Sequence, residues 1–381
     1  MLTPAVAGLT AVIVVGLFAC GWCWIIAGLR AGLTLGWITG DAADAVLLVL
    51  RPLRVPPRLP LVEWSPRRPV PWALFDLFAL VGIWLGSQLA IAGLLRDTGW
   101  IPRGSDLKTL TLDQRQAFIV ANVAVSLAIL AIGLPLISLR TGAKTRDFGF
   151  SLTDVPRDIG RGLIGLVMLA PPVYVLQAIL VTVWKPSSHL LVELFKGTPN
   201  PVFFIVLFVA AAIVAPLFEE LMFRVILQGF LERAFTHRGP LWELLFDRPR
   251  GLPLAVAAEP LPKSLEPPVA AVLAPSTGGL NPYDSPQDVS EPEFVAEVVD
   301  DQQPELRGPA AWLPIGISAI VFALMHWSHG PDWVPLTFLA AGMGYLYQRT
   351  HRLVPSLIVH AGLNALSMWM LWVHVFEGVK V

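Results

Sequence analysis

Long apolar runs with almost no charged residues dominate this 381-residue sequence. Of all residues, 55% are hydrophobic and only 14% are charged. About 20 consecutive apolar residues suffice to cross the hydrocarbon core of a bilayer as an α-helix, whereas a soluble domain carries about 25% charged residues. The sequence therefore predicts an all-α, polytopic membrane protein.

Eight apolar segments are expected to form transmembrane helices. They are residues 4–29, 70–95, 116–139, 162–184, 201–223, 312–331, 333–349 and 353–376. Lys and Arg concentrate in the cytoplasmic loops of membrane proteins. With the N-terminus outside, 20 of the 27 Lys and Arg residues lie on the inner side. We therefore expect an integral membrane protein with its N-terminus outside and its longest loop in the cytoplasm.

Residues 238–309 differ in composition from the rest of the chain. They hold 13 of its 34 prolines, and Asp284–Glu305 contains eight acidic residues and no basic one. Such a segment buries too little apolar surface to offset its chain entropy, so we expect a disordered cytoplasmic insertion. The sequence then divides into N-terminal helices with a basic linker (1–140), a first core part (141–237), the insertion (238–309) and a second core part (310–381).

The residues that interrupt the apolar runs fall into three patches. They are Glu219, Glu220 and Arg224 in the first, Phe322 and His326 in the second, and His360 and Asn364 in the third. Ionisable residues inside membrane spans normally face a cavity and mark function. Arg224 follows Glu220 by four residues, so the two share a helix face and are expected to pair. Glu219 is turned about 100° from Glu220 and stays without that neutralising charge.

The same four-residue spacing recurs in the other two patches. It places the Phe322 ring beneath the His326 imidazole, and it presents His360 and Asn364 on one helix face. A carboxylate such as Glu219 suits a general base that activates water together with His326. His360 and Asn364 suit donors to a developing oxyanion. Because no Ser or Cys nucleophile accompanies these groups, the set favours direct hydrolysis of an amide bond.

Two other interpretations fit the same residues. Glu219, His326 and His360 could instead ligate Zn²⁺, with bound water as the nucleophile. The patches could also be structural, as a buried ion pair and packed core histidines. The net charge of −1 gives no reason to expect a nucleic-acid partner.

The three patches resemble, in order, the EExxxR, FxxxH and HxxxN motifs of the CPBP family of membrane proteases. The family comprises CaaX prenyl endopeptidases and bacterial bacteriocin-processing and immunity proteases, and the similarity covers about residues 145–375. The resemblance implies that Glu219 and His326 activate water, that His360 and Asn364 form the oxyanion site, and that Glu220, Arg224 and Phe322 support them.

The resemblance also implies a CPBP-type core, no obligatory cofactor, a bacterial cytoplasmic membrane and a membrane-associated substrate, with CaaX-type substrates among the alternatives. A catalytically silent scaffold or immunity-type binding protein is the alternative function. A proton-coupled carrier is a weaker one, because paired repeats with broken helices are not evident in the sequence.

Overall fold

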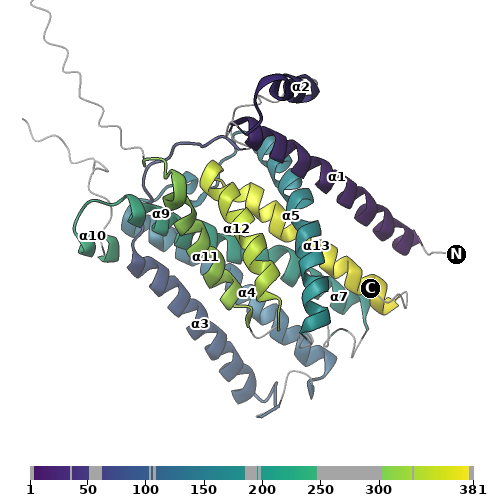
Figure 1. Ribbon diagram of the computed structural model, residues 1–381. Helices are drawn as coiled ribbons and strands as arrows, with labels where there is room; N and C mark the ends of the chain where they lie inside the picture. Colours follow the sequence, from purple (N-terminus) through teal and green to yellow (C-terminus); the bar gives the residue numbers. More distant parts are fainter. Residues whose placement is uncertain are drawn as a thin grey trace, which may run out of the picture.

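The computed structural model is helical throughout the part of the chain that it describes (Figure 1). The described residues are 4–34, 37–50, 62–102, 104–105, 109–184, 195, 199–246, 303–327 and 330–376. No strand occurs within these ranges. The predicted all-α, polytopic membrane fold is confirmed.

Within the described ranges, six helices are long and apolar enough to cross a membrane. They are α1 (Pro4–Thr34), α3 (Leu74–Asp97), α4 (Leu112–Thr141), α5 (Val155–Val183), the continuous helix Pro201–Thr236 and α13 (Leu353–Phe376). Helices also occupy the other two predicted spans, but they are shorter or more polar: α11 (Trp312–Leu324) and α12 (Trp333–Thr350).

The expected span 312–331 is wrong at its C-terminal end. α11 has 13 residues, a rise of about 20 Å, against a hydrocarbon core of about 30 Å. The chain turns after Leu324, and Gly330 takes the left-handed conformation with φ of 86° just before Pro331. Glycine in this conformation followed by proline is incompatible with a continuing helix.

The helix over Pro201–Thr236 changes its winding twice. Two π-helical segments alternate with three α-helical ones, in the order α7 (Pro201–Phe208), η4 (Val209–Val214), α8 (Ala215–Glu220), η5 (Leu221–Gln228) and α9 (Gly229–Thr236). In the first π segment the Ala215 amide donates to the Ala210 carbonyl, five residues back. Both glutamates of the first patch therefore lie in a short α segment between two wider turns, a feature that is frequent at functional sites.

α13 lies at the centre of the bundle, against α5, α12 and α8 (Figure 1). Leu169, Leu346 and Val359 are buried between these helices. Gly165 of α5 permits the close approach, because a Cβ there would lie 2.8 Å from Leu346 Cδ1 and 2.9 Å from Val359 Cγ2.

α1 docks at a break in the hydrogen bonding of α5. Pro172 has no N–H, so the Met168 carbonyl four residues earlier lacks its helical donor. Trp24 Nε1 of α1 donates to that carbonyl at 3.0 Å. The Met168 carbonyl that lacks a donor within α5 thus accepts the hydrogen bond that holds α1 against α5.

The end of the bundle at which α3, α5, α11 and α13 begin is called the basic face here. Short helices lie at this end: α2 (Gly40–Leu50), η3 (Thr145–Phe148), α10 (Leu241–Phe246) and η6 (Gly308–Ala311). The Leu353 amide donates to the Gly149 carbonyl at 3.1 Å. Gly149 has φ of 77°, and a Cβ would lie 2.8 Å from Leu353 N, so this contact requires glycine.

Both ends of the predicted 238–309 insertion have defined structure. α10 forms near its start, and near its end the Gln303 amide donates to the Arg67 carbonyl at 2.8 Å. Glu305 pairs with Arg349 at 2.6 Å. The prediction of disorder is wrong for residues 238–246 and 303–309 because these contacts anchor them to the bundle. Residues 247–302 lie outside the described residues, and the four-part division of the chain stays a prediction.

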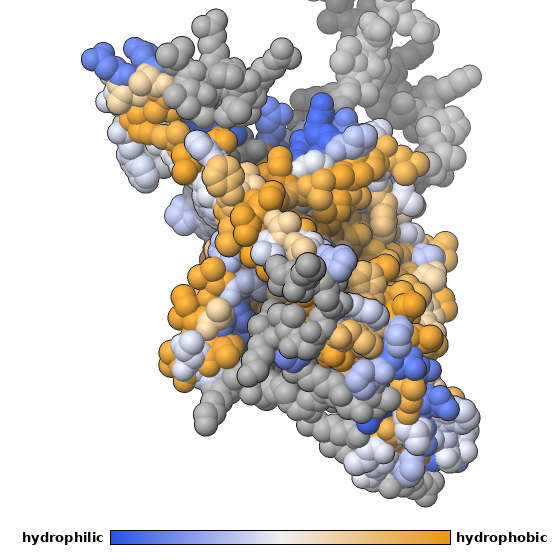
Figure 2. Space-filling view, turned by 90° about the vertical axis from the view of Figure 1, so that its right-hand side faces the viewer, coloured by the Kyte–Doolittle hydropathy of each residue, from blue (hydrophilic) through white to orange (hydrophobic). Residues whose placement is uncertain are grey.

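Apolar side chains cover much of the outer surface. Figure 2 shows them across the middle of one face, with hydrophilic residues gathered toward the two ends. Phe18, Leu89, Leu139 and Val183 are among the exposed ones. Exposed apolar surface on this scale fits contact with lipid tails, and the chain is an integral membrane protein.

Candidate active site

Glu220 and Arg224 form the buried ion pair predicted from their spacing. Both side chains are fully buried, and Arg224 Nε lies 3.5 Å from Glu220 Oε2. Arg224 Nη1 donates to Ser318 Oγ at 3.0 Å, and the Arg224 guanidinium carbon lies 5.3 Å from the centre of the Phe322 ring. The arginine therefore ties the first patch to α11.

Glu219 has a different environment from its neighbour. Its side chain is 24% exposed, while that of Glu220 is 0% exposed. The Glu219 Oε2 atom lies 3.6 Å from His360 Nε2. One carboxylate of the pair is thus sealed inside the bundle, and the other is accessible from outside it.

His360 lies between the two glutamates. Its Nδ1 lies 3.0 Å from Glu220 Oε1, and its Nε2 faces Glu219. An ionised carboxylate only accepts hydrogen bonds, so Nδ1 carries a hydrogen and donates it. We expected His360 to act with Asn364 at the oxyanion site, and the structure places both glutamates next to it as well.

His326 lies just beyond the end of α11, not within a span as expected. Its Nδ1 lies 2.9 Å from the Phe322 carbonyl oxygen, which only accepts, so Nδ1 carries a hydrogen. In the neutral ring the lone pair is then on Nε2, the arrangement required of a base.

The Phe322 side chain brings the three patches together. Its ring centre lies 4.9 Å from that of His326 and 5.6 Å from that of His360. The same ring lies beneath the Arg224 guanidinium, and it is 0% exposed. Arg224 and His360, which are 136 positions apart in the sequence, thus meet around one aromatic ring.

Asn364 is partly committed to the backbone. Its Nδ2 donates to the Ala211 carbonyl oxygen at 2.8 Å. In the π-helical segment the donor to Ala211 would be the amide of residue 216, which is a proline and has no N–H. Asn364 therefore satisfies a carbonyl that the helix leaves unpaired, and one of its two amide hydrogens remains for another acceptor.

Two serines at the site were missed in the sequence. Ser318 accepts from Arg224 and donates to the Phe223 carbonyl at 2.8 Å. Ser356 is fully buried and adjoins the Glu220 carboxylate. Each precedes a motif residue by four positions, so both patches on α11 and α13 continue one helical turn toward the basic face. This four-residue spacing was the sequence signal from which both serines could have been predicted.

Among the described residues, no set of side chains is arranged as the zinc alternative requires. No group of three or more His, Cys, Asp or Glu side chains within them is arranged to hold a metal ion. Glu219 and His360 approach each other, but His360 Nδ1 is bound to Glu220. His329, the histidine three positions after His326, lies outside the described residues.

The fold and the site define a polytopic helical membrane protein with an acid and histidine site enclosed by its helices. Residues 201–256 and 301–366 match the family model described as type II CAAX prenyl endopeptidase Rce1-like. The matched residues contain all three patches. The match supports the predicted membership of the CPBP family and, with it, a hydrolase of the protease class. No curated protein and no solved structure matches the chain.

Proposed function

We propose that this protein is an intramembrane endopeptidase that hydrolyses a peptide bond of a membrane-associated substrate. The observation that carries the proposal is the convergence of His326 and His360 on the buried Phe322 ring, with the Glu219 carboxylate 3.6 Å from His360 Nε2. The match of two segments to a family model described as type II CAAX prenyl endopeptidase Rce1-like supports the same reaction class. The CaaX-type substrate named by that description is part of the proposal.

Glu219 is proposed as the general base. It is the accessible carboxylate of the pair, and its neighbour Glu220 is already engaged by Arg224 and His360. Glu219 accepts a proton from water while the water oxygen bonds to the scissile carbonyl carbon. His326 accepts a second hydrogen bond from that water through Nε2. The proton held by Glu219 then passes to the amide nitrogen as the C–N bond breaks, which yields a carboxylic acid and an amine, and the acid then gives its proton to the amine.

His360 and Asn364 are proposed as donors to the tetrahedral oxyanion. Asn364 retains one amide hydrogen after its bond to Ala211. Because His360 Nδ1 donates to Glu220, Nε2 can donate to the oxyanion only when the ring is protonated. The Glu220 carboxylate, 3.0 Å from Nδ1, stabilises that charged form while Glu219 holds the proton taken from water. Glu220 then has a defined role, which is to keep the imidazolium in place.

A peptidase assay with purified protein tests this proposal. The probes are a prenylated CaaX-type peptide and its unprenylated counterpart in neutral detergent micelles. Glu219→Gln should lower kcat/KM by about 10²-fold to 10⁴-fold, because it removes the base and preserves the shape. Asp41→Asn, an exposed acid of α2, serves as the matched control and should retain the parent rate.

The alternative function predicts a different result. A catalytically silent scaffold would bind the peptide without cleaving it, and Glu219→Gln would leave that binding unchanged. Absence of cleavage by the folded parent protein with either peptide would therefore count against the endopeptidase. Full activity of Glu219→Gln would remove Glu219 from the mechanism.

A further inference from the structure

A polar cavity of about 620 Å³ opens at the basic face. It is bounded by residues 63–70, by the segment 146–154, by the first turns of α5 and by the connection between α12 and α13. The proposed active site uses none of these residues. Six arginines line the cavity against three carboxylates: Arg67, Arg68, Arg146, Arg157, Arg161 and Arg352 against Glu63, Asp147 and Asp154.

Two of the arginines are committed to the core of the bundle. Arg67 Nη2 lies 2.7 Å from Glu232, whose side chain is 2% exposed. Arg68 makes a two-pronged contact with Asp147 through Nε and Nη2. Such paired contacts fix the guanidinium groups. These two arginines therefore form the floor of the cavity and have little charge to offer a ligand.

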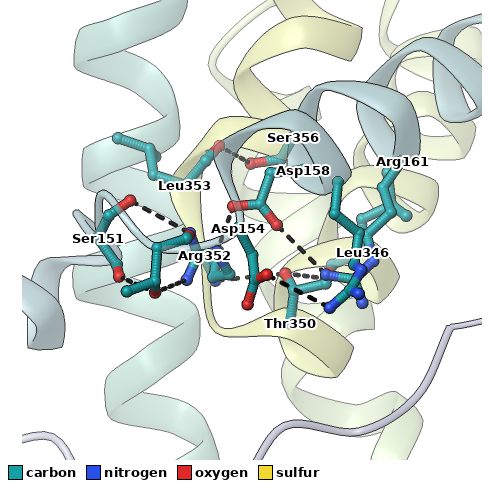
Figure 3. A network of polar contacts seen from close by, with 11 residues as sticks. Ser151, Asp154, Asp158, Arg161, Leu346, Thr350, Arg352, Leu353 and Ser356 are labelled. Carbon is teal, nitrogen blue, oxygen red and sulfur yellow. Dashed lines mark hydrogen bonds and ion pairs between the residues drawn. The ribbon is translucent and has the colours of Figure 1, made fainter.

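Arg352 is also held by its contacts. Because it shares the Asp158 carboxylate with Arg161, Arg161 is only partly paired. Figure 3 shows Asp158 between Arg352 and Arg161. Arg352 contacts Asp158 through Nε and also donates to the backbone carbonyls of Ser151 and Thr153. Arg161 reaches the same carboxylate through Nη1 alone, at 3.2 Å. Two cations share one carboxylate, so one positive charge is left without compensation.

The remaining two arginines are exposed. Arg157 lies 3.4 Å from Asp154, with side chains 67% and 57% exposed, and such surface pairs contribute little. The exposed Arg146 side chain has no hydrogen bond or ion pair with the described residues, and it lines the cavity. Since Arg157 and Arg161 are four residues apart on α5, their side chains lie on the same side of that helix.

Apolar side chains adjoin this cluster of arginines. Leu152 is 96% exposed, and Phe150 is exposed beside it. Ile159 and Leu163 are exposed too, but each lies two residues from an arginine of the cavity and therefore on the opposite side of α5. The exposed side chains of Phe150 and Leu152 beside a charged cavity are the arrangement that a lipid with an anionic headgroup requires.

We propose that this cavity binds a phosphate-bearing anion through Arg146, Arg157 and Arg161, and that the phosphate is the headgroup of an anionic phospholipid in the adjacent leaflet. Guanidinium groups form paired hydrogen bonds with phosphate oxygens, and three of them suit a phosphate better than a single carboxylate. The adjoining Phe150 and Leu152 would contact the acyl chains.

Binding to the full chain tests the assignment. Delipidated protein in neutral detergent is titrated with mixed micelles of phosphatidylglycerol, with mixed micelles of phosphatidylcholine, and with inorganic phosphate. Trp64 lines the cavity, so tryptophan fluorescence supports a calorimetric measurement. We expect saturable binding of phosphatidylglycerol, at least tenfold tighter than phosphatidylcholine or inorganic phosphate.

A charge-matched pair of variants localises the site. Arg146→Gln/Arg157→Gln removes two exposed guanidinium groups of the cavity, and Arg238→Gln/Arg307→Gln removes two exposed ones elsewhere at the same end. The first pair should weaken phosphatidylglycerol binding at least tenfold, and the second less than twofold. Both should unfold at the parent temperature, because all four side chains are exposed.

Three outcomes would overturn the proposal. Equal weakening by both pairs would mean attraction by general surface charge. Equally tight binding of inorganic phosphate, with the same arginine dependence, would assign the cavity to a soluble phosphate compound. Binding of a peptide with a free terminal carboxylate, again with that dependence and without lipid binding, would make the cavity a peptide site.

Discussion

His360 Nδ1 and Glu220 Oε1 lie 3.0 Å apart, although the two residues are separated by 140 positions in the sequence. This hydrogen bond joins α13 to the helix that carries both glutamates. It fixes the orientation of the imidazole, so that Nε2 faces Glu219 at 3.6 Å. The buried carboxylate thus positions the ring next to the accessible one.

Neutralising Glu220 should lower catalysis and also cost stability, because it leaves Arg224 buried without its ion pair. Glu220→Gln preserves the size of the side chain but removes the negative charge that stabilises a protonated His360. We expect kcat to fall by about 10²-fold, the loss typical for one oxyanion donor, with KM little changed. Steady-state kinetics beside Glu63→Gln, an exposed acid at the basic face, measure the effect. An unchanged kcat would contradict the role given to Glu220.

Removing Arg224 should cost stability as well as activity. Arg224→Ala leaves Glu220 buried without its ion pair, which destabilises a protein by about 3–5 kcal/mol. Denaturant unfolding in micelles should show this loss, whereas Glu219→Gln should unfold like the parent. Equal and purely catalytic losses in the two variants would mean that the two glutamates have been assigned the wrong roles.

The stability lost on removing the hydrogen bond from Asn364 to the Ala211 carbonyl should depend on whether residue 216 is proline. Asn364→Ala leaves a buried carbonyl unpaired, at a cost of about 1–3 kcal/mol. Pro216→Ala restores an amide that can donate to that carbonyl, so Asn364→Ala should cost at least about 0.5 kcal/mol less in that background. A double-mutant cycle by unfolding measures the difference. Activity lost in Asn364→Ala should not return, since the restored amide replaces only the structural bond.

The metal content of the purified protein distinguishes the general-base mechanism from the zinc mechanism, which the sequence left open. A zinc site typically needs three protein ligands and a bound water. We expect well under one zinc per chain in purified protein, and activity that survives strong chelators. Metal analysis of the parent and of His326→Ala decides the matter. Stoichiometric zinc that disappears together with activity in that variant would turn Glu219, His326 and His360 into ligands.

The sequence by itself determined the local features of this protein. The apolar runs predicted the helices, because a chain in lipid must satisfy its backbone hydrogen bonds internally. The four-residue spacing predicted the pair of Glu220 with Arg224 and the contact of the Phe322 ring with His326. These contacts lie within a turn of one helix, so helical geometry is enough to place them.

Only the tertiary structure decided how the patches meet. Three contacts join helices that are far apart in the sequence. They are His360 with Glu220, Asn364 with the Ala211 carbonyl, and Ser318 with Arg224. The π-helical winding around the glutamates also lacks a local sequence signal, apart from Pro216. These features depend on how helices pack and on which carbonyls that packing leaves unpaired. Helical periodicity fixes which residues share a face, but the packing of helices against one another fixes which faces touch.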